Sequence, residues 1–355
     1  MRAWIDVDLG ALLRNARALA AHAAKPLVPM IKADAYGLGA VPVARALEAL
    51  DPLAYGVATI GEGEELRGAG ISRPIMLFSP HRVADLARIR AAAMTPTLAS
   101  AEGVDAWAGA GGGAWHLAID TGMHRAGVQW DAIAPVLDAV RRHPPAGAFT
   151  HFESAELDDG SLERQEERFR AAVAQLPARP PLLHTQNSAA IVRRSPSPWD
   201  CVRPGIFLYG VGSGPGAALQ PEPVVSLHAE ILELREIAAG EGVSYNATWR
   251  AQRPSRIATI ACGYADGVRR QLGNRAHALI AGARAPLVGV VTMDMTLLDV
   301  TDIAACSVGD RVTLLGESGG RRQDVETLAA SAAISPYELL TGLRQRLPRF
   351  HTSPA

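Results

Sequence analysis

The chain has 355 residues, of which 48% are hydrophobic and 20% are charged, and its formal net charge is -1. This length exceeds one small domain and predicts a barrel together with a smaller domain. A chain so close to neutrality has no basic field that would attract nucleic acid or a membrane surface. Because no apolar run approaches 18 residues and the N-terminal segment lacks the apolar part of a signal peptide, we expect a soluble, cytoplasmic protein.

The sequence gives little indication of a metal site or of disulfide bonds. The three cysteines, Cys201, Cys262 and Cys306, include no CxxC pair, which argues against a disulfide framework. The ten histidines show neither an HExxH motif nor Cys/His ligand spacing. We therefore expect no metal site.

The first predicted strand is the apolar run 27–31, and it ends on Lys32. A turn of small residues that includes Tyr36 and Gly37 follows. Burial of a lysine disfavours its charged form, so a lysine in this place has a lowered pKa and becomes a good nucleophile toward a carbonyl. That is what a Schiff-base lysine requires. The run alone leaves a second interpretation open, in which Lys32 is a solvated residue at a strand end.

Short apolar or β-branched runs alternate with helical patterns as far as Tyr209. The helical spacing is clear over 161–175, where charged and apolar residues recur on opposite faces. Eight strands that alternate with helices predict a closed (β/α)8 barrel of the TIM type, which we assign to residues 8–220. The predicted strands after the first are 54–58, 74–78, 95–98, 115–119, 147–151, 182–184 and 201–206.

The sequence changes in character after the barrel. Residues 210–216 are rich in glycine, which is typical of a linker. From Val224 onward apolar and polar residues alternate with period two, and several such runs follow without helices between them. We therefore predict a β-rich C-terminal domain over residues 221–355. Residues 1–7 contain a similar alternating run and are assigned to the same domain, as a strand that would bring the two termini together.

Polar side chains follow the predicted strands, at the ends where barrel enzymes place their chemistry. Arg125 follows the fifth strand, His151 ends the sixth, His184 ends the seventh and is followed by Asn187–Ser188, and Arg203 lies in the eighth. Taken singly, each has a structural explanation, such as a solvated turn residue, a core histidine or a helix cap. Their joint placement on one face of the barrel predicts a functional site.

Several of these segments carry motifs that resemble the alanine racemases, a family of barrel-type enzymes that use pyridoxal phosphate. The resemblance extends from Ile5 to Arg344, and the motifs occur in the family's order. They are IKADAYG (31–37), DTGMHR (120–125), THF (150–152), NS (187–188), VRPG (202–205), VSY (243–245), GYADG (263–267) and MD (293–294).

The resemblance implies a pyridoxal-phosphate site, with Lys32 holding the cofactor as an internal aldimine. Arg203 would face the pyridine nitrogen and, because arginine cannot accept a proton, would keep that nitrogen unprotonated. The weaker electron sink would favour return of a proton to Cα over side reactions. His184 is implied as the partner of Arg203, with His151 near the same network. The residues implied to bind the cofactor phosphate are Tyr36, Ser188, Gly205, Ile206 and Tyr337.

Racemisation needs a base on each face of a planar carbanion. The resemblance implies Lys32 on one face and Tyr245 on the other, although the sequence alone describes Tyr245 equally well as a tyrosine on a half-buried strand. Arg125 and the backbone of Met293 would bind the carboxylate of a small amino-acid substrate. The family arrangement implies a homodimer with shared active sites. The residues implied on the partner's side of each site are Tyr245, Tyr264 and Met293, with Asp294 behind them.

One position departs from the family pattern. Many relatives carry a lysine, often carbamylated, seven residues before the motif arginine, where this chain has Ala118. Another group or a bound anion must then orient Arg125, or the carboxylate site is looser, as in relatives of broader specificity. Ala118 leaves open a racemase of broader or serine specificity as an alternative to an alanine-specific enzyme. Two further alternatives are a decarboxylase of the same barrel class and a non-catalytic pyridoxal-phosphate carrier. The decarboxylases usually have an acidic group in place of Arg203, and the carriers lack the β-rich domain.

Overall fold

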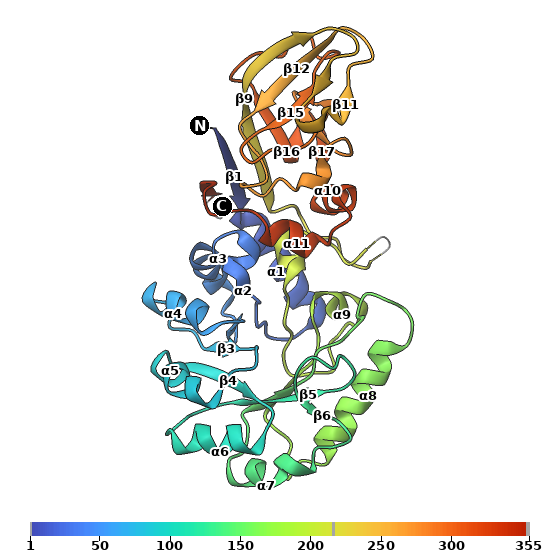
Figure 1. The fold of residues 1–355 in the computed structure, drawn as a ribbon. Coiled ribbons are helices and arrows are strands. Elements are labelled where there is room, and N and C mark those ends of the chain that lie inside the picture. Colours follow the sequence, from blue (N-terminus) through green and yellow to red (C-terminus); the bar gives the residue numbers. More distant parts are fainter. Residues whose placement is uncertain (1, 215–216, 353–355) are drawn as a thin grey trace.

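The computed structural model describes residues 2–214 and 217–352, so positions 215 and 216 of the predicted linker lie outside the described residues. Parallel strands form the lower part of the molecule in the order β2-β3-β4-β5-β7-β8, with β6 beside β5 (Figure 1). These strands are β2 (Tyr55–Val57), β3 (Ile75–Leu77), β4 (Met94–Leu98), β5 (His116–Asp120), β6 (Val128–Gln129), β7 (Gly147–Phe149) and β8 (Leu182–His184).

The predicted first and eighth strands, 27–31 and 201–206, are extended segments with isolated bridges and not regular strands. Proline has no N–H to donate to a ladder, and Pro29 and Pro204 interrupt the two segments. The eighth prediction was also too long, because the chain turns at its end into the short 3-10 helix η3 (Ile206–Tyr209).

These two segments nevertheless close the barrel. The first segment joins β2 on one side and the eighth segment on the other, and the eighth in turn contacts β8. A closed ring of parallel backbone was the predicted fold, and it is confirmed. The contacts that complete the ring are the bridges Met30–Gly56 and Leu27–Val202 and the hydrogen bond from the Asp200 N–H to the Leu183 carbonyl (2.9 Å).

Helices cover the outside of the barrel (Figure 1). In α8 (Ser161–Ala174), Leu162, Phe169 and Ala172 are buried, as the spacing predicted. The charged positions between them are partly or fully exposed, except for Glu166, which is buried. The other helices of this part are α1 (Leu9–Ala23), α2 (Lys32–Gly37), α3 (Ala40–Leu47), η1 (Glu48–Leu50), α4 (Ile60–Gly68), η2 (Val83–Asp85), α5 (Leu86–Ala91), α6 (Ala101–Gly109), α7 (Ala134–Arg142) and α9 (Ser188–Arg193).

The upper part of the molecule is β-rich, as predicted, and is built around the long strand β9 (Val225–Ile237). Leu227, Ala229 and Ile231 are buried along β9, in keeping with the period of two in a strand. The remaining elements are β10 (Gly242–Val243), η4 (Tyr245–Ala247), β11 (Trp249–Arg250), β12 (Ser255–Ile260), η5 (Arg270–Leu272), β13 (His277–Ile280), β14 (Ala283–Pro286), β15 (Thr296–Asp299), β16 (Arg311–Ser318), β17 (Arg321–Gln323), α10 (Val325–Ala332) and α11 (Pro336–Thr341).

Strands from the two ends of the sequence meet in this upper sheet. β1 (Ala3–Asp8) pairs antiparallel with β9, and Ile5 lies opposite Leu227. On its other side β1 pairs in parallel with β18 (Arg349–Thr352), and Ile5 lies opposite Arg349. The first and last described strands of the chain therefore lie side by side near the junction of the two parts (Figure 1).

Within residues 2–214 and 217–352, no helix has the length and apolar character needed to cross a bilayer. The same described ranges contain no group of three or more His, Cys, Asp or Glu side chains placed to hold a metal ion. Cys201, Cys262 and Cys306 are all buried and unpaired.

Candidate active site

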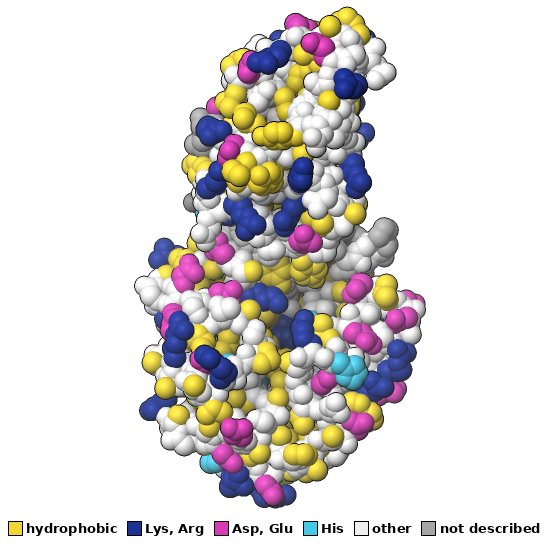
Figure 2. All heavy atoms as spheres, in the orientation of Figure 1, with side chains coloured by type: hydrophobic (Ala, Val, Ile, Leu, Met, Phe, Trp, Pro, Cys, Tyr) yellow, Lys and Arg dark blue, Asp and Glu magenta, His cyan; other side chains and the backbone are white. Residues whose placement is uncertain are grey.

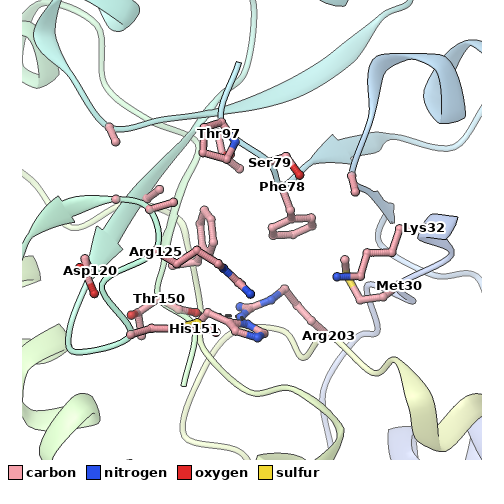
Figure 3. A pocket seen from close by; sticks show the side chains of 18 of the residues that line it. Met30, Lys32, Phe78, Ser79, Thr97, Asp120, Arg125, Thr150, His151 and Arg203 are labelled. Atoms are coloured by element: carbon pink, nitrogen blue, oxygen red, sulfur yellow. Dashed lines mark hydrogen bonds between the residues drawn. The ribbon is translucent and has the colours of Figure 1, made fainter. Parts of the chain in front are cut away.

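A cavity of about 550 Å³ opens at the carboxyl ends of the barrel strands, below the β-rich part. Figure 2 shows a hollow between the two parts, with Lys and Arg side chains on its floor. In Figure 3, Lys32, Arg125, Arg203 and His151 point toward one common space from different strand ends. The residues predicted from the sequence that line this cavity are Lys32, Tyr36, Arg125, His151, Ser188, Arg203, Gly205, Ile206 and Tyr337.

Lys32 begins a turn of unusual hand, the short helix α2. The four residues after it, 33–36, have φ between 51° and 57° and therefore lie in the left-handed region. A left-handed conformation costs an L-residue about 1–2 kcal/mol, or about 4–8 kcal/mol for the four residues. The sequence predicted a turn here but not its hand. Backbone strain of this size persists only where surrounding contacts fix the conformation.

Contacts at the far end of the turn supply part of that restraint. Gly37 has a φ of +85°, and a Cβ at this position would lie 2.6 Å from the carbonyl oxygen of Leu340 in α11. Glycine is therefore required at this position, because of the positive φ and because of the close approach of the Leu340 carbonyl. Arg349 Nε donates to the Gly37 carbonyl at 2.7 Å, and His351 Nε2 lies 2.7 Å from the Leu38 carbonyl oxygen. The C-terminal segment of the same chain thus braces the lysine turn.

The environment of Lys32 favours its neutral amine. Burial lowers the pKa of the Lys32 ammonium, and the charges of Arg125 and Arg203 lower it further, while the Glu62 carboxylate acts in the opposite direction. A lowered pKa leaves more of the amine unprotonated at neutral pH, which is the form that a nucleophile or a base must have. Lys32 is partly buried, which favours the Schiff-base interpretation over a fully solvated lysine.

A cradle for an anion lies beside this turn. The Ser188 hydroxyl accepts the N–H of Gly205 at 2.8 Å. A Cβ at Gly205 would lie 2.5 Å from the Tyr36 hydroxyl, so glycine lets these two groups approach each other. Burial raises the pKa of Tyr36, which keeps its hydroxyl neutral and able to donate. The Tyr337 ring, 6.0 Å from that of Tyr36, completes a wall of hydroxyl and backbone donors suited to a phosphate.

Arg203 is a buried cation on the cavity wall, with 3% of its surface exposed. Its guanidinium donates to His184 Nδ1 at 2.8 Å and to the backbone oxygens of His184, Thr150 and Thr185 at 2.7–3.0 Å. In the part of the chain that the structure describes, no Asp or Glu pairs with it. Burial lowers the pKa of Arg203 to about 10, so it remains charged at neutral pH.

The histidines around Arg203 are neutral. Because arginine only donates, His184 Nδ1 must accept, and its Nε2–H donates to His116 Nδ1 at 2.8 Å. Burial and the Arg203 charge lower the pKa of His116 to about 4 and that of His151 to about 3. The sequence pointed to His184 and His151 but missed His116, whose signal is a lone histidine at the start of an apolar strand.

Arg125 lies on a loop that Asp120 orders. Asp120 Oδ1 accepts the N–H groups of Gly122 and His124 at 3.0 and 3.1 Å. Ala118 lines the same cavity. Among residues 2–214 and 217–352, no side chain forms a hydrogen bond or an ion pair with the Arg125 guanidinium. Within this chain, therefore, no described group takes the place of the lysine that many relatives carry.

Of the residues predicted in the β-rich part, Tyr337 of α11 lines this cavity. The other four, Tyr245, Tyr264, Met293 and Asp294, lie outside it. Tyr245, Tyr264 and Met293 are 68%, 43% and 53% exposed. Asp294 accepts from Arg346 Nη2 at 2.7 Å, which holds the Met293 loop against the rest of the domain. The second predicted base, Tyr245, is thus exposed in this chain and lies outside the cavity that contains Lys32.

Comparisons with known proteins agree with this arrangement. Residues 7–213 match the family described as the N-terminal domain of alanine racemase, and residues 224–351 match its C-terminal domain. The chain is 37% identical over 374 residues to the alanine racemase of Sorangium cellulosum, with 98% of each chain covered. Its structure is similar to that of Bacillus anthracis alanine racemase with bound L-Ala-P, with a TM-score of 0.91 and 29% identity over 99% of this chain and 95% of that one. A second similar structure is Bartonella henselae alanine racemase with covalently bound pyridoxal phosphate, with a TM-score of 0.90 and 29% identity over 99% and 100% of the two chains. The chain therefore belongs to the alanine racemase family.

Proposed function

We propose that this protein interconverts L-alanine and D-alanine, with pyridoxal phosphate held at Lys32. The observation that carries the proposal is a single cavity in which Lys32 faces Arg203, a buried cation without a carboxylate partner among the described residues. Membership of the family supports it, as does the similar structure with covalently bound pyridoxal phosphate.

The residues present fit this cofactor. The Lys32 amine would hold the aldehyde carbon, and Arg203 would face the ring nitrogen and keep it unprotonated. When bound, pyridoxal phosphate supplies an electron sink for the pair left on the substrate Cα. A protein that keeps this sink weak favours return of the proton over transamination. The cradle that would hold the phosphate consists of Tyr36, Ser188, Gly205, Ile206 and Tyr337.

Two bases would move the proton. Once the substrate amine has displaced it, Lys32, whose lowered pKa favours the neutral amine, would take the Cα proton of D-alanine, and in the reverse direction it would deliver a proton to that face. Tyr245 of the partner subunit would serve the opposite face. Arg125 would bind the substrate carboxylate, together with the backbone of Met293 of the partner subunit. Neutral His151 would contact the cofactor, and His184 would hold Arg203 in place.

The same proposal implies an assembly and a place in the cell. Because Tyr245 and Met293 are exposed and outside the cavity of their own chain, we propose a homodimer in which Tyr264 and Asp294 also support the partner's site. We assign residues 8–220 to the barrel domain, and 1–7 with 221–355 to the β-rich domain. We further propose that the enzyme is cytoplasmic and supplies D-alanine for cell-wall synthesis.

A racemase of broader or serine specificity is the second candidate. The observation that favours it is that Ala118 lines the same cavity as Arg125, whose guanidinium has no hydrogen-bond partner in the described ranges. A less restrained arginine tolerates more positions of the substrate carboxylate. Arg203 argues against a decarboxylase, and the β-rich domain with Tyr245 argues against a non-catalytic carrier.

A racemase assay on a panel of amino acids, read by chiral chromatography, tests the function directly. We expect alanine to react fastest, and serine roughly 10–100-fold more slowly, since a small pocket discriminates weakly against one added hydroxyl. The sequence contains two lysines, Lys25 and Lys32. Borohydride reduction and peptide mapping should place the cofactor on Lys32, with Lys25→Arg as the matched control. Cofactor on Lys25, or an absence of racemisation, would refute the proposal.

Arg203 offers a test of how the reaction avoids side products. We expect Arg203→Glu to lower racemisation by roughly 10²–10³-fold and to raise pyruvate formation per racemisation event. The reason is that an acidic group can supply a proton to the ring nitrogen, whereas arginine cannot. Arg203→Lys keeps the positive charge and is the control, in which the ratio of pyruvate to racemised product should stay low. An unchanged ratio in Arg203→Glu would contradict this role.

A further inference from the structure

One carboxylate joins the lysine turn to the neighbouring loop between β2 and α4. Glu62 Oε1 accepts the N–H of Ala33 at 2.7 Å. Its other oxygen, Oε2, accepts the N–H groups of Ala58 and Thr59 at 2.7 and 3.0 Å. Short bonds from backbone N–H groups to a carboxylate are stronger than neutral ones, so Glu62 fixes two backbone segments relative to each other.

The bond to Ala33 falls at a sensitive place. Ala33 directly follows Lys32 and is the first residue of the turn with a left-handed φ, 52°. The far end of the turn is held by Arg349 at the Gly37 carbonyl. A strained segment fixed at both ends keeps its conformation, and the direction in which the Lys32 side chain leaves the backbone is then fixed as well.

We propose that Glu62 is a positioning residue for Lys32: it anchors the first peptide of the left-handed turn, and its carboxylate adds a negative charge to the surroundings of the amine. The catalytic part of this inference rests on the proposed function, and the structural part does not. In the sequence alone, nothing in Glu62 pointed to a role in the lysine site.

The charge of Glu62 has a defined direction of effect. It raises the pKa of Lys32, whereas burial, Arg125 and Arg203 lower that pKa. Removal of the carboxylate charge therefore lowers the pKa of Lys32 further. The neutral amine then persists to lower pH, and the acidic limb of any rate that depends on neutral Lys32 moves to lower pH.

A simpler role for Glu62 is to cap its own helix. Thr59 and Glu62 form a capping box at the start of α4, in which the Thr59 hydroxyl accepts the Glu62 N–H at 3.2 Å. The two roles are separable, because Thr59→Val removes the hydroxyl half of the box and leaves the bond between Glu62 and Ala33. Thr59→Val is therefore the matched control for Glu62→Gln, in which the amide group has one acceptor oxygen and no charge.

The test uses the full-length protein labelled with ¹³C at the lysine side chains. With two lysines in the sequence, the NMR titration contains one signal for Lys32 and one for Lys25, measured after removal of any bound cofactor. In Glu62→Gln we expect the pKa of Lys32 to fall by at least about half a unit, with Lys25 unchanged. In the cofactor-loaded protein, we expect the 31–37 peptide to exchange its amide hydrogens roughly tenfold faster, as expected for a local opening that costs less free energy.

The control separates positioning from capping. Thr59→Val should lower the melting temperature but leave the Lys32 titration and the 31–37 exchange as in the wild type. The inference is wrong, and Glu62 is only a helix cap, if Glu62→Gln leaves the Lys32 titration and the 31–37 exchange unchanged. It is also wrong if Thr59→Val changes these two quantities as much as Glu62→Gln does. If Glu62→Gln does not fold, the variant Glu62→Asp tests whether Glu62 positions the lysine turn. Its carboxylate is too short to span both segments, so exchange should rise, and unchanged exchange would overturn the inference.

Steady-state kinetics test whether the position of Lys32 affects the reaction. For conversion of D-alanine, we expect Glu62→Gln to lower kcat roughly tenfold with little change in KM, since a displaced base reduces the proton-transfer step. The acidic limb of the kcat profile should move to lower pH together with the Lys32 titration. A wild-type protein without racemase activity would refute the proposed function, while the titration and the exchange would still decide the role of Glu62.

Discussion

Replacement of Tyr245 by phenylalanine is expected to reduce racemisation by at least roughly 10²–10⁴-fold, the usual contribution of a positioned acid or base. The change removes one hydroxyl from a side chain that is 68% exposed on its own subunit. It should therefore leave folding, and the cofactor bound at Lys32, unaffected. The measurement is deuterium exchange at Cα, started separately from L-alanine and from D-alanine.

The two enantiomers provide the internal control for this variant. Exchange from L-alanine should be lost, because the base on that face is gone, whereas exchange from D-alanine should continue through Lys32. Retention of the visible absorption of the bound cofactor would show that the site is still loaded. Wild-type exchange from both enantiomers would contradict the role of Tyr245.

Mixing two inactive variants should restore activity. Lys32→Ala lacks one base and Tyr245→Phe lacks the other, so each homodimer is expected to be inactive. A mixed dimer that shares its sites across the interface contains one site with both wild-type groups and one site with neither. With free exchange of equal amounts of subunits, half of the dimers are mixed, and the activity should reach about a quarter of the wild-type value.

The mixing experiment also tests the assembly itself. Subunit exchange is shown independently by mass spectrometry of dimers in which one variant carries a heavy isotope. Lys25→Ala mixed with Tyr245→Phe is the control, since Lys25 lies outside the cavity lining and the Lys25→Ala homodimer should be active before mixing. Proven exchange without recovery in the first mixture would mean that each site is built within one chain.

Local sequence patterns were sufficient to predict the barrel and to place several of its polar residues around one cavity, whereas the roles given to them came from the family resemblance. The alternation of strands and helices is visible in the sequence as short apolar runs separated by segments with helical spacing. The carboxyl ends of barrel strands meet on one face. Lys32, Arg125, His151 and Arg203 could therefore be grouped by their positions along the chain alone. The same patterns overstated the first and eighth strands, since prolines limit the regular pairing there while hydrogen bonds around them still close the ring.

The features that the sequence did not predict depend on contacts between distant segments. The left-handed turn after Lys32 is stabilised by Glu62 and by Arg349, and neither residue is near it in sequence. Ala33 and its neighbours have no intrinsic preference for this hand, so no local signal could have revealed it. His116 became visible for the same reason, once β5 and β8 placed it against His184.

The pairing of β1 with β18 also sets the order of events during protein synthesis. The ribosome completes the barrel before it makes Arg349 and His351, which brace the lysine turn. The nascent barrel therefore holds Lys32 on a turn that has not yet received all of its restraints. The restraints from Arg349 and His351 become available only after β18 has been synthesised and can pair with β1. The lysine turn therefore receives two of its restraints late, although Lys32 precedes most of the barrel in the chain.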